Sequence, residues 1–415
     1  MERFSQALSR YLLYIVPAYV LVDYFLRLSG SSLLVSLWDE ILFILIAGSW
    51  VLHIAVKGVK PSSGGLLIPL LLFYSVVFFN YLAVSGEPAV AMMELRAVIQ
   101  YSFWFFLALN LVSSKQQVKN ICDLFLLVGL VVALYGIYQY IAGVEMPAAW
   151  VDKAEVGIRT RAFSFIGSPN VLGSFTILNI SIAFASFMAS SNWIKKRLYL
   201  GTAAISALCL VFTLSRGAWL VFFFAFILLA LWLDKRIIIA LLLVAIITPV
   251  AVPSVYNRMA YMLSPQYVAS SSEGGRIAGW SQAVEYWQGA PAAGLGLGRF
   301  GGGVAIANFP KSAYSVDNYY LKLAVETGLM GIAAFLYLLF SVVRRGKRAV
   351  DRASDPYLKV LGTGILVALI AILGHNMVEN LFEFPLISTY FWFFLGVLLA
   401  LPLISDPKMG VEQDG

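Results

Sequence analysis

Long apolar segments separated by short polar stretches recur along the whole chain. A run of about twenty apolar residues is long enough to cross the hydrocarbon core of a bilayer as a helix. The pattern predicts twelve spans, at residues 10–28, 34–56, 65–84, 94–113, 120–141, 169–190, 198–215, 217–233, 237–253, 319–343, 357–376 and 384–402. We therefore expect an all-α polytopic membrane protein with a single integral membrane domain over residues 1–415.

The composition excludes an ordinary soluble protein. Of the 415 residues, 60% are hydrophobic and 12% are charged, whereas a soluble domain has about 25% charged residues. The only cysteines, Cys122 and Cys209, lie in or next to apolar segments, and there are two histidines. This predicts neither a disulfide framework nor a metal cluster, and we expect no cofactor. The N-terminal segment is basic and then apolar over a long run, which predicts a retained first helix rather than a cleaved signal peptide.

The lysines and arginines predict the orientation of the chain in the membrane. With both termini in the cytoplasm, short basic connections such as RRGKR at 344–348 fall on the cytoplasmic side. The other basic residues are spread over long outer loops. We therefore assign the net charge of +7 to membrane topology rather than to nucleic-acid binding.

Two long connections fall outside under this topology, at residues 142–168 and 254–318. Loops of this length are usually functional or disordered. In the second loop, the segment RIAGWSQAVEYWQG at 276–289 predicts an amphipathic helix with aromatic side chains at the lipid headgroups.

One glycine motif in the second loop matches the dinucleotide-binding fingerprint by spacing alone. Gly296, Gly298 and Gly301 fit the pattern G-x-G-x-x-G, but no strand of a βαβ unit precedes them. A flexible hinge or close backbone packing is the better interpretation.

Five arginines lie on the expected outer side, at or near the membrane boundary. They are Arg96, Arg159, Arg161, Arg216 and Arg276. Arginine at membrane depth is costly and needs an anionic partner or a wet cavity, and its fixed fork of donors suits phosphate oxygens. The alternative, which we favour for any single arginine, is snorkelling to lipid headgroups or pairing with nearby acids. For Arg216, tightly bracketed by apolar residues, we favour a functional role.

Several acids and one histidine are candidates for proton transfer. Asp317 and Asn318 precede the tenth span, where they fit either a helix cap or, for Asp317, a carboxylate that deprotonates a hydroxyl nucleophile. Glu326 lies further inside that span, where a buried hydrogen-bonded acid is more plausible than a base. His375, at the outer end of the eleventh span, fits a base, a phosphate donor or an interfacial histidine.

At these residues the chain resembles the O-antigen ligase and O-antigen polymerase superfamily of bacterial envelopes. The resemblance rests on five segments in the expected order. They are LRAVIQY at 95–101, RAFSFIGSPNVLGSF at 161–175, TLSRGAWL at 213–220, GGRIAGWSQAVEYWQGAPAAGLGLGRF at 274–300 and DNYYLKLAVETGLMG at 317–331.

The resemblance implies a glycosyltransferase-C type membrane enzyme in the bacterial cytoplasmic membrane, with its active site facing outward. Its donor would be a glycan on undecaprenyl diphosphate, its acceptor a glycan or glycolipid, and it would use neither a nucleotide sugar nor a metal. Arg161, Arg216 and Arg276 would bind the diphosphate, with Asn170 and Asn318 in support. The expected reaction is a direct displacement with inversion at the anomeric carbon, in which Asp317 or His375 deprotonates the acceptor.

One departure from the family pattern separates the two activities. Ligases and many polymerases have His-Asn where this chain has Asp317-Asn318, and the Asp-Asn form resembles exopolysaccharide and capsule-type polymerases more closely. We therefore expect a polymerase, with a ligase as the alternative. A transporter or flippase for a lipid-linked sugar is a rival of another class, although the charged residues gather at the outer boundary and no internal repeat is evident. A structural scaffold would not need five outer arginines and two long outer loops.

Overall fold

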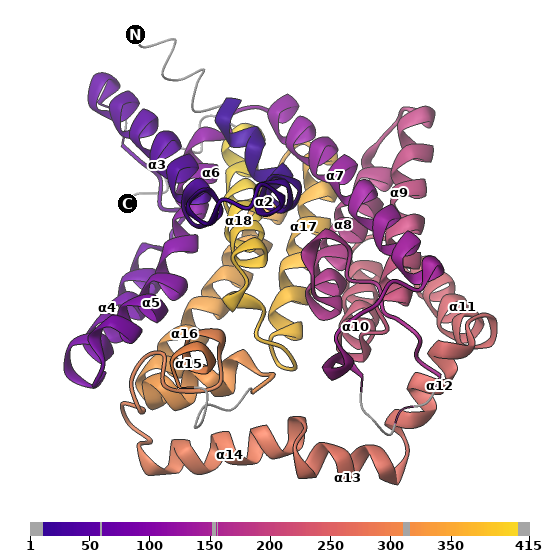
Figure 1. Cartoon of the computed structure of the whole chain (residues 1–415). Coiled ribbons are helices and arrows are strands. Elements are labelled where there is room, and N and C mark those ends of the chain that lie inside the picture. The colour runs from indigo at the N-terminus through magenta and orange to yellow at the C-terminus, as the bar shows by residue number, and fades with distance from the viewer. Residues whose placement is uncertain (1–10, 59, 152–154, 156, 310–315, 406–415) are drawn as a thin grey trace.

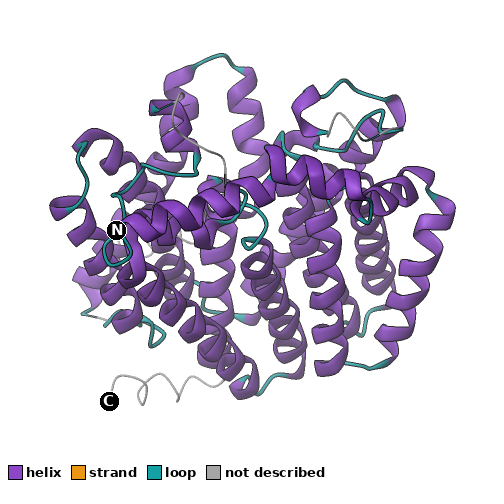
Figure 2. Ribbon diagram, turned by 90° about the horizontal axis from the view of Figure 1, so that it is seen from below, coloured by secondary structure: helices purple, strands orange, loops and turns teal. Residues whose placement is uncertain are grey.

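The computed structural model describes residues 11–58, 60–151, 155, 157–309 and 316–405, and these contain helices and loops but no strand (Figure 2). The elements are η1 Leu13–Ala18, α2 Tyr19–Leu28, α3 Ser32–Lys57, α4 Leu67–Ala83, α5 Pro88–Ile99, η2 Gln100–Ser102, α6 Phe103–Leu111, α7 Lys115–Ala142, η3 Ala148–Trp150, η4 Ser164–Ile166, α8 Pro169–Ala189, α9 Trp193–Phe212, α10 Arg216–Trp232, α11 Arg236–Ala251, α12 Pro253–Met262, α13 Pro265–Glu273, α14 Arg276–Gly289, α15 Gly303–Asn308, α16 Tyr319–Arg352, α17 Pro356–His375, η5 Leu381–Glu383 and α18 Pro385–Ser405.

The helices confirm an all-α polytopic membrane protein. Each of the twelve predicted ranges contains helix. In the described part of the chain, six helices are long and apolar enough to cross a membrane, and a seventh span results if α11 and α12 are counted together. The count is lower than twelve because several predicted ranges hold shorter or interrupted helices. For example, α4 and α10 are apolar but have 17 residues each.

The chain bends sharply between α11 and α12, and this bend begins the long connection at 254–318. The two helix axes differ by 101°, because Val252 is extended and Pro253 starts the new helix. Helices α13 and α14 then run end to end along one edge of the molecule (Figure 1). The segment RIAGWSQAVEYWQG forms α14, as the sequence predicts.

Helix α16 is interrupted at Gly328, which lies in the left-handed region with φ of 64°. The break frees backbone groups that a continuous helix would pair internally. The carbonyls of Val325 and Glu326 instead accept hydrogen bonds from the amides of Leu295 and Gly296, at 2.9 and 3.0 Å. The segment after α14 is therefore joined to the membrane helix by backbone hydrogen bonds.

The core of the bundle is formed by α8, α17 and α18, most of whose side chains are buried. Helix α8 packs against α9 and α17, and α17 packs against α10 and α16. The start of α8, the end of α9, the start of α10, the end of α17 and the start of α16 meet near α13 and α14. We call this end of the bundle the α14 face and the other end the opposite face.

Close approach of glycine backbones explains the G-x-G-x-x-G segment. Gly296, Gly298 and Gly301 have φ values of 102°, 70° and 72°. A Cβ atom at Gly296 would lie 2.9 Å from the Cα atom of Ser85. These glycines serve close backbone packing in left-handed conformations.

Candidate functional site

The turn between α9 and α10 lies on the α14 face, near α12 and α13. Leu214 has a φ of 50°, which is unusual for a residue with a side chain. Ser215 then caps α10, its hydroxyl accepting a hydrogen bond from the amide of Ala218. The carbonyls of Thr213 and Leu214 accept hydrogen bonds from two buried arginines. Hydrogen bonds from two arginine side chains therefore stabilise this strained turn.

Arg161 is one of these two arginines, and protein acceptors surround it. Its Nε donates to the Thr213 carbonyl at 2.9 Å, Nη1 to the Trp150 carbonyl at 2.9 Å, and Nη2 to Asn170 Oδ1 at 3.0 Å. The residue is 4% exposed. Burial, together with the nearby charges of Arg258 and Arg216, lowers the pKa of Arg161 to about 9. Arg161 remains charged at neutral pH. Its hydrogen bonds join the loop that contains Trp150 to the turn between α9 and α10.

Arg258, in α12, is the second arginine, and the sequence motifs do not single it out. Its Nε donates to the Leu214 carbonyl at 3.0 Å, and its Nη1 forms an ion pair with the buried carboxylate of Glu155. The only signal in the sequence is a basic residue soon after Pro253, in a short helix. That signal is weak because such residues usually face solvent.

Arg216 is the first residue of α10 and differs from these two. Its guanidinium lies 4.7 Å from the ring centroid of Tyr267 and 5.9 Å from that of Tyr261, both from the α12–α13 region. Within the described residues, its Nη1 is buried and has no hydrogen-bond partner. A buried donor without an acceptor costs about 1–3 kcal/mol. A role for Arg216 in diphosphate binding stays a prediction, and this unpaired donor is the atom that it would use.

Arg276, the first residue of α14, lies between two carboxylates. Its Nε is 3.2 Å from Asp317 Oδ2, and its Nη2 is 3.8 Å from Glu379 Oε2. The side chains of Arg276 and Asp317 are 25% and 36% exposed, so this part of the site is open to solvent. The long connection and the start of α16 thus bring opposite charges together at an accessible point.

Asn170 links the two halves of the site. Its Oδ1 accepts from Arg161, and its Nδ2 donates to the carboxylate of Glu379. A continuous network therefore runs from Arg161 through Asn170, Glu379 and Arg276 to Asp317. Burial, together with the negative charge of Asp317, raises the pKa of Glu379 to about 7. The sequence motifs do not single out Glu379.

Asn318 and His375 have well-defined structural partners. Asn318 caps α16, its Oδ1 accepting from the amide of Leu321 at 3.1 Å. His375 is 1% exposed at the end of α17, and its Nδ1 lies 2.5 Å from Ser174 Oγ. A Cβ atom at Gly217 would lie 3.1 Å from His375 Nε2, so the start of α10 covers the other ring nitrogen. Asp317 is much more accessible than His375.

Glu326 belongs to a separate buried cluster. It accepts hydrogen bonds from the Phe300 amide at 3.1 Å and from Lys322 Nζ at 3.1 Å. Lys322 also forms ion pairs with Glu94 and Glu383. This cluster joins α5, α16 and the connection before α18, and the described contacts do not connect it to the arginine network.

Two further predicted arginines are not brought into this network. Arg96 forms an ion pair with Glu40 of α3 and donates to Gln100 at 2.7 Å. Arg159 is exposed, and its guanidinium lies against the backbone of Gly143. A role for either residue in diphosphate binding stays a prediction.

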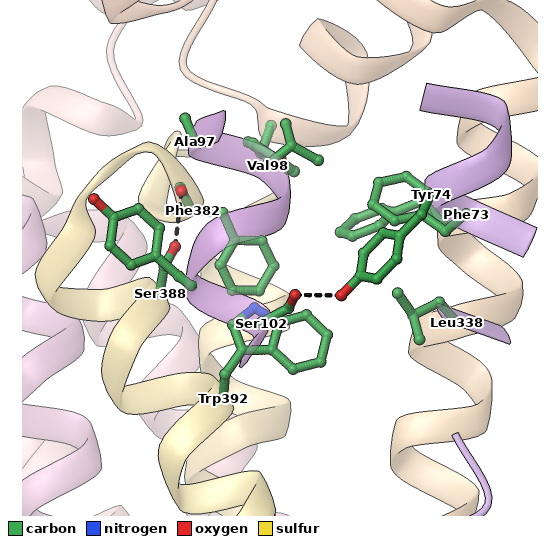
Figure 3. A pocket seen from close by; sticks show the side chains of 12 residues that line it. Phe73, Tyr74, Ala97, Val98, Ser102, Leu338, Phe382, Ser388 and Trp392 are labelled. Atoms are coloured by element: carbon green, nitrogen blue, oxygen red, sulfur yellow. Dashed lines mark hydrogen bonds between the residues drawn. The ribbon is translucent and has the colours of Figure 1, made fainter. Parts of the chain in front are cut away.

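An aromatic pocket between α4, α16 and α18 lies apart from these charges (Figure 3). Phe73 and Tyr74 face Phe382 and Trp392 across it, and the Tyr74 hydroxyl is hydrogen-bonded to Ser102. No charged residue lines this pocket. It therefore lacks the groups that would bind a diphosphate.

A comparison with protein families finds a match over the middle of the chain. Residues 201–336 match a family model described as O-antigen ligase. The matched range runs from α9 into α16 and contains Arg216, Arg258, Arg276 and Asp317. No curated protein matches the chain. The resemblance to the O-antigen ligase and polymerase superfamily is confirmed by the family match.

Proposed function

We propose that this chain, of which residues 201–336 match the O-antigen ligase family model, is an inverting glycosyltransferase of the bacterial cytoplasmic membrane. Its donor is an oligosaccharide on undecaprenyl diphosphate, bound at the outer membrane boundary. Its acceptor is another lipid-linked repeat unit, so the enzyme polymerises cell-surface polysaccharide. The family match supports a glycosyltransferase-like enzyme. Substrate, orientation and mechanism belong to the proposal.

The single observation that carries the proposal is the unpaired Nη1 of Arg216. Neighbouring Arg161 and Arg258 direct donors to protein acceptors, whereas Arg216 retains a buried donor beside them. A diphosphate oxygen would satisfy this donor and neutralise part of the clustered positive charge. Charge-assisted hydrogen bonds of this kind are about twice as strong as neutral ones.

Arg276 supplies the second positive group in the proposal. It lies at an accessible point, and its two carboxylate partners hold it at 3.2 and 3.8 Å. Positive groups fixed before the reaction stabilise the charge that develops on a leaving diphosphate. Guanidinium groups would then supply the charge stabilisation that a metal ion supplies in other enzymes.

Asp317 is the preferred base in this proposal. Its carboxylate is partly exposed and faces the guanidinium of Arg276, whereas His375 is enclosed. The acceptor hydroxyl attacks the anomeric carbon from the side opposite the diphosphate and transfers its proton to Asp317. The bond between the anomeric carbon and the phosphate oxygen breaks, and its electron pair leaves with undecaprenyl diphosphate. The new glycosidic bond has the inverted configuration.

A ligase is the second candidate, because the matching family model is described as O-antigen ligase. The two activities share the donor and differ in the acceptor. Asp317, in place of the family's histidine, favours the polymerase.

The test is product analysis with purified full-length protein and lipid-diphosphate-linked repeat units from its host. A ladder of longer lipid-linked chains establishes a polymerase, and the ladder should be lost in Arg216→Ala. Transfer only after lipid A-core is added indicates a ligase. No product under either condition favours the transporter. The matched control is Arg27→Ala, which removes an exposed arginine paired with Asp23.

A further inference from the structure

A charged hollow lies on the opposite face of the bundle. Helices of about 20 residues join the two faces, so the hollow is about 30 Å from the arginine network. It is formed where the start of α7, the turn between α8 and α9, and the start of α17 meet. Its volume is about 360 Å³, within the range of about 300–1,000 Å³ that is usual for ligand pockets.

Three lysines, Lys115, Lys119 and Lys195, line this hollow. Lys115 forms an ion pair with Asp355, and Lys195 lies 3.0 Å from Asp123. The Nζ of Lys119 lies 4.3 Å from the ring centroid of Tyr357, and no carboxylate among the described residues pairs with it. Two carboxylates therefore pair with two of the three lysines. The ammonium group of Lys119 has no carboxylate partner among the described residues and can donate hydrogen bonds to an anion.

The wall beside the hollow is apolar and open. On α9, Lys195 and Tyr199 share one face because they are four residues apart, and Ile194 and Leu198 share the adjacent face. Ile194 and Leu198 are 54% and 64% exposed, and Trp193 is 60% exposed. A soluble anion would not use this surface, whereas the acyl chains of a lipid would cover it.

We propose that this hollow binds the phosphodiester of an anionic glycerophospholipid, with its acyl chains along the exposed face of α9. Lys119 is the main anion contact, and Lys115 and Lys195 complete the positive rim. A headgroup that carries its own ammonium would meet the lysines with like charge, so phosphatidylglycerol binds better than phosphatidylethanolamine. The bound lipid would hold together the starts of α7, α9 and α17, independently of the proposed glycosyl transfer.

The test is native mass spectrometry of the full-length protein in detergent, titrated with phosphatidylglycerol, phosphatidylethanolamine of the same chains, or inorganic phosphate. Phosphatidylglycerol should bind more tightly than phosphatidylethanolamine. Lys119→Gln should weaken its binding about five-fold, the usual effect of one lysine near an anionic lipid, and Lys119→Arg should restore it. The matched control is Lys347→Gln, which removes an exposed lysine paired with Asp351 on α16.

Three results would overturn the proposal. Equal binding of the two lipids would remove the charge recognition, and an equal loss in Lys347→Gln would indicate general surface attraction. Displacement of phosphatidylglycerol by an equal concentration of inorganic phosphate would make the hollow a site for soluble anions. If Lys119→Gln does not fold, Lys195→Gln tests the same rim from another helix, with the same expected loss. Turnover is not measured, so the result is separate from that of the proposed function.

Discussion

Arg276 Nε and Asp317 Oδ2 lie 3.2 Å apart, although 41 residues separate them in the chain. Arg276 begins α14, and Asp317 directly precedes Asn318, the N-cap of α16. Because Asn318 provides the capping oxygen, the carboxylate of Asp317 is directed to Arg276 and the accessible part of the site. The structure thus assigns the helix cap to Asn318, and the role of Asp317 as a base belongs to the proposed function.

Asp317→Asn should lower the turnover of lipid-linked donor with little change in protein stability. The amide cannot accept the acceptor's proton, and loss of general base catalysis costs about 10²–10⁴-fold in rate. The measurement is kcat with purified protein, alongside a thermal melt. The matched variant is Asn318→Ala, which removes a helix cap and should cost about 1 kcal/mol of stability. An Asp317→Asn protein with normal turnover would remove Asp317 from the mechanism.

Arg161→Ala and Arg216→Ala should differ in whether they lower protein stability or mainly turnover. Arg161 donates hydrogen bonds to three protein acceptors, so its loss should lower both stability and turnover. Each hydrogen bond to a charged group contributes about 1.5–3 kcal/mol to the free energy of unfolding. Arg216 has a buried donor without a partner in the described structure, so its loss should mainly reduce turnover, by about a hundredfold. Melting temperatures and kcat of both variants check this. Similar melting and turnover losses in the two would contradict the distinction.

The sequence predicts the helices well because membrane helices are specified by local apolar composition. Each predicted range contains helix, and α14 begins and ends where its segment predicts. The helix interruptions were harder to predict. Leu214 is left-handed, and arginines from distant segments bind the carbonyls of this turn. Arg161 donates to the Thr213 carbonyl and Arg258 to the Leu214 carbonyl.

The site is only partly predictable for the same reason. Arg216 and Arg276 stand out in sequence because each lies in an apolar or glycine-rich context. Arg258 and Glu379 acquire their partners only through the fold, since Glu155 comes from the connection after α7 and Asn170 from the start of α8. The positions of charged residues along the chain therefore indicate which of them are candidates for the site. Which residues pair with one another is seen only in the tertiary structure.

Gly328→Ala should destabilise the protein. Gly328 has a φ of 64°, and a Cβ atom there would overlap the carbonyl of Ala292. Backbone strain of this kind costs about 1–3 kcal/mol before the overlap is added. The matched control is Gly374→Ala in α17, where the nearest atom would be 3.8 Å away. A thermal melt should show a clear decrease for the first variant and almost none for the second.

Lys322→Met should destabilise the protein more than loss of any one of its carboxylate partners. The lysine is 1% exposed and lies among Glu94, Glu326 and Glu383. Removing one member of a buried ion pair costs about 3–5 kcal/mol, because the other charge is left unpaired. Glu383→Gln keeps the lysine paired with two acids and should be milder. Equal losses in the two variants would argue against Lys322 as the centre of the cluster.

Glu379 should make both stability and donor binding depend on pH. Its pKa is raised to about 7 in the folded protein, from an ordinary value of 4.5. Between these values the folded state keeps the proton and the unfolded state loses it. Stability should therefore fall as the pH rises from about 4.5 to about 7, since the folded state binds more protons.

The same titration should affect donor binding on the α14 face. Below pH 7 Glu379 is mainly neutral, and the positive charge of Arg276 is less compensated. As the pH rises through 7, the carboxylate forms and competes with the diphosphate for this guanidinium, so the Kd for the donor should increase.

Glu379→Gln should flatten this part of the Kd profile and of the melting profile between pH 5 and 8. Asp23→Asn, at a carboxylate paired with exposed Arg27, should leave both profiles unchanged. A Glu379→Gln profile with the wild-type slope would assign the titration to another group.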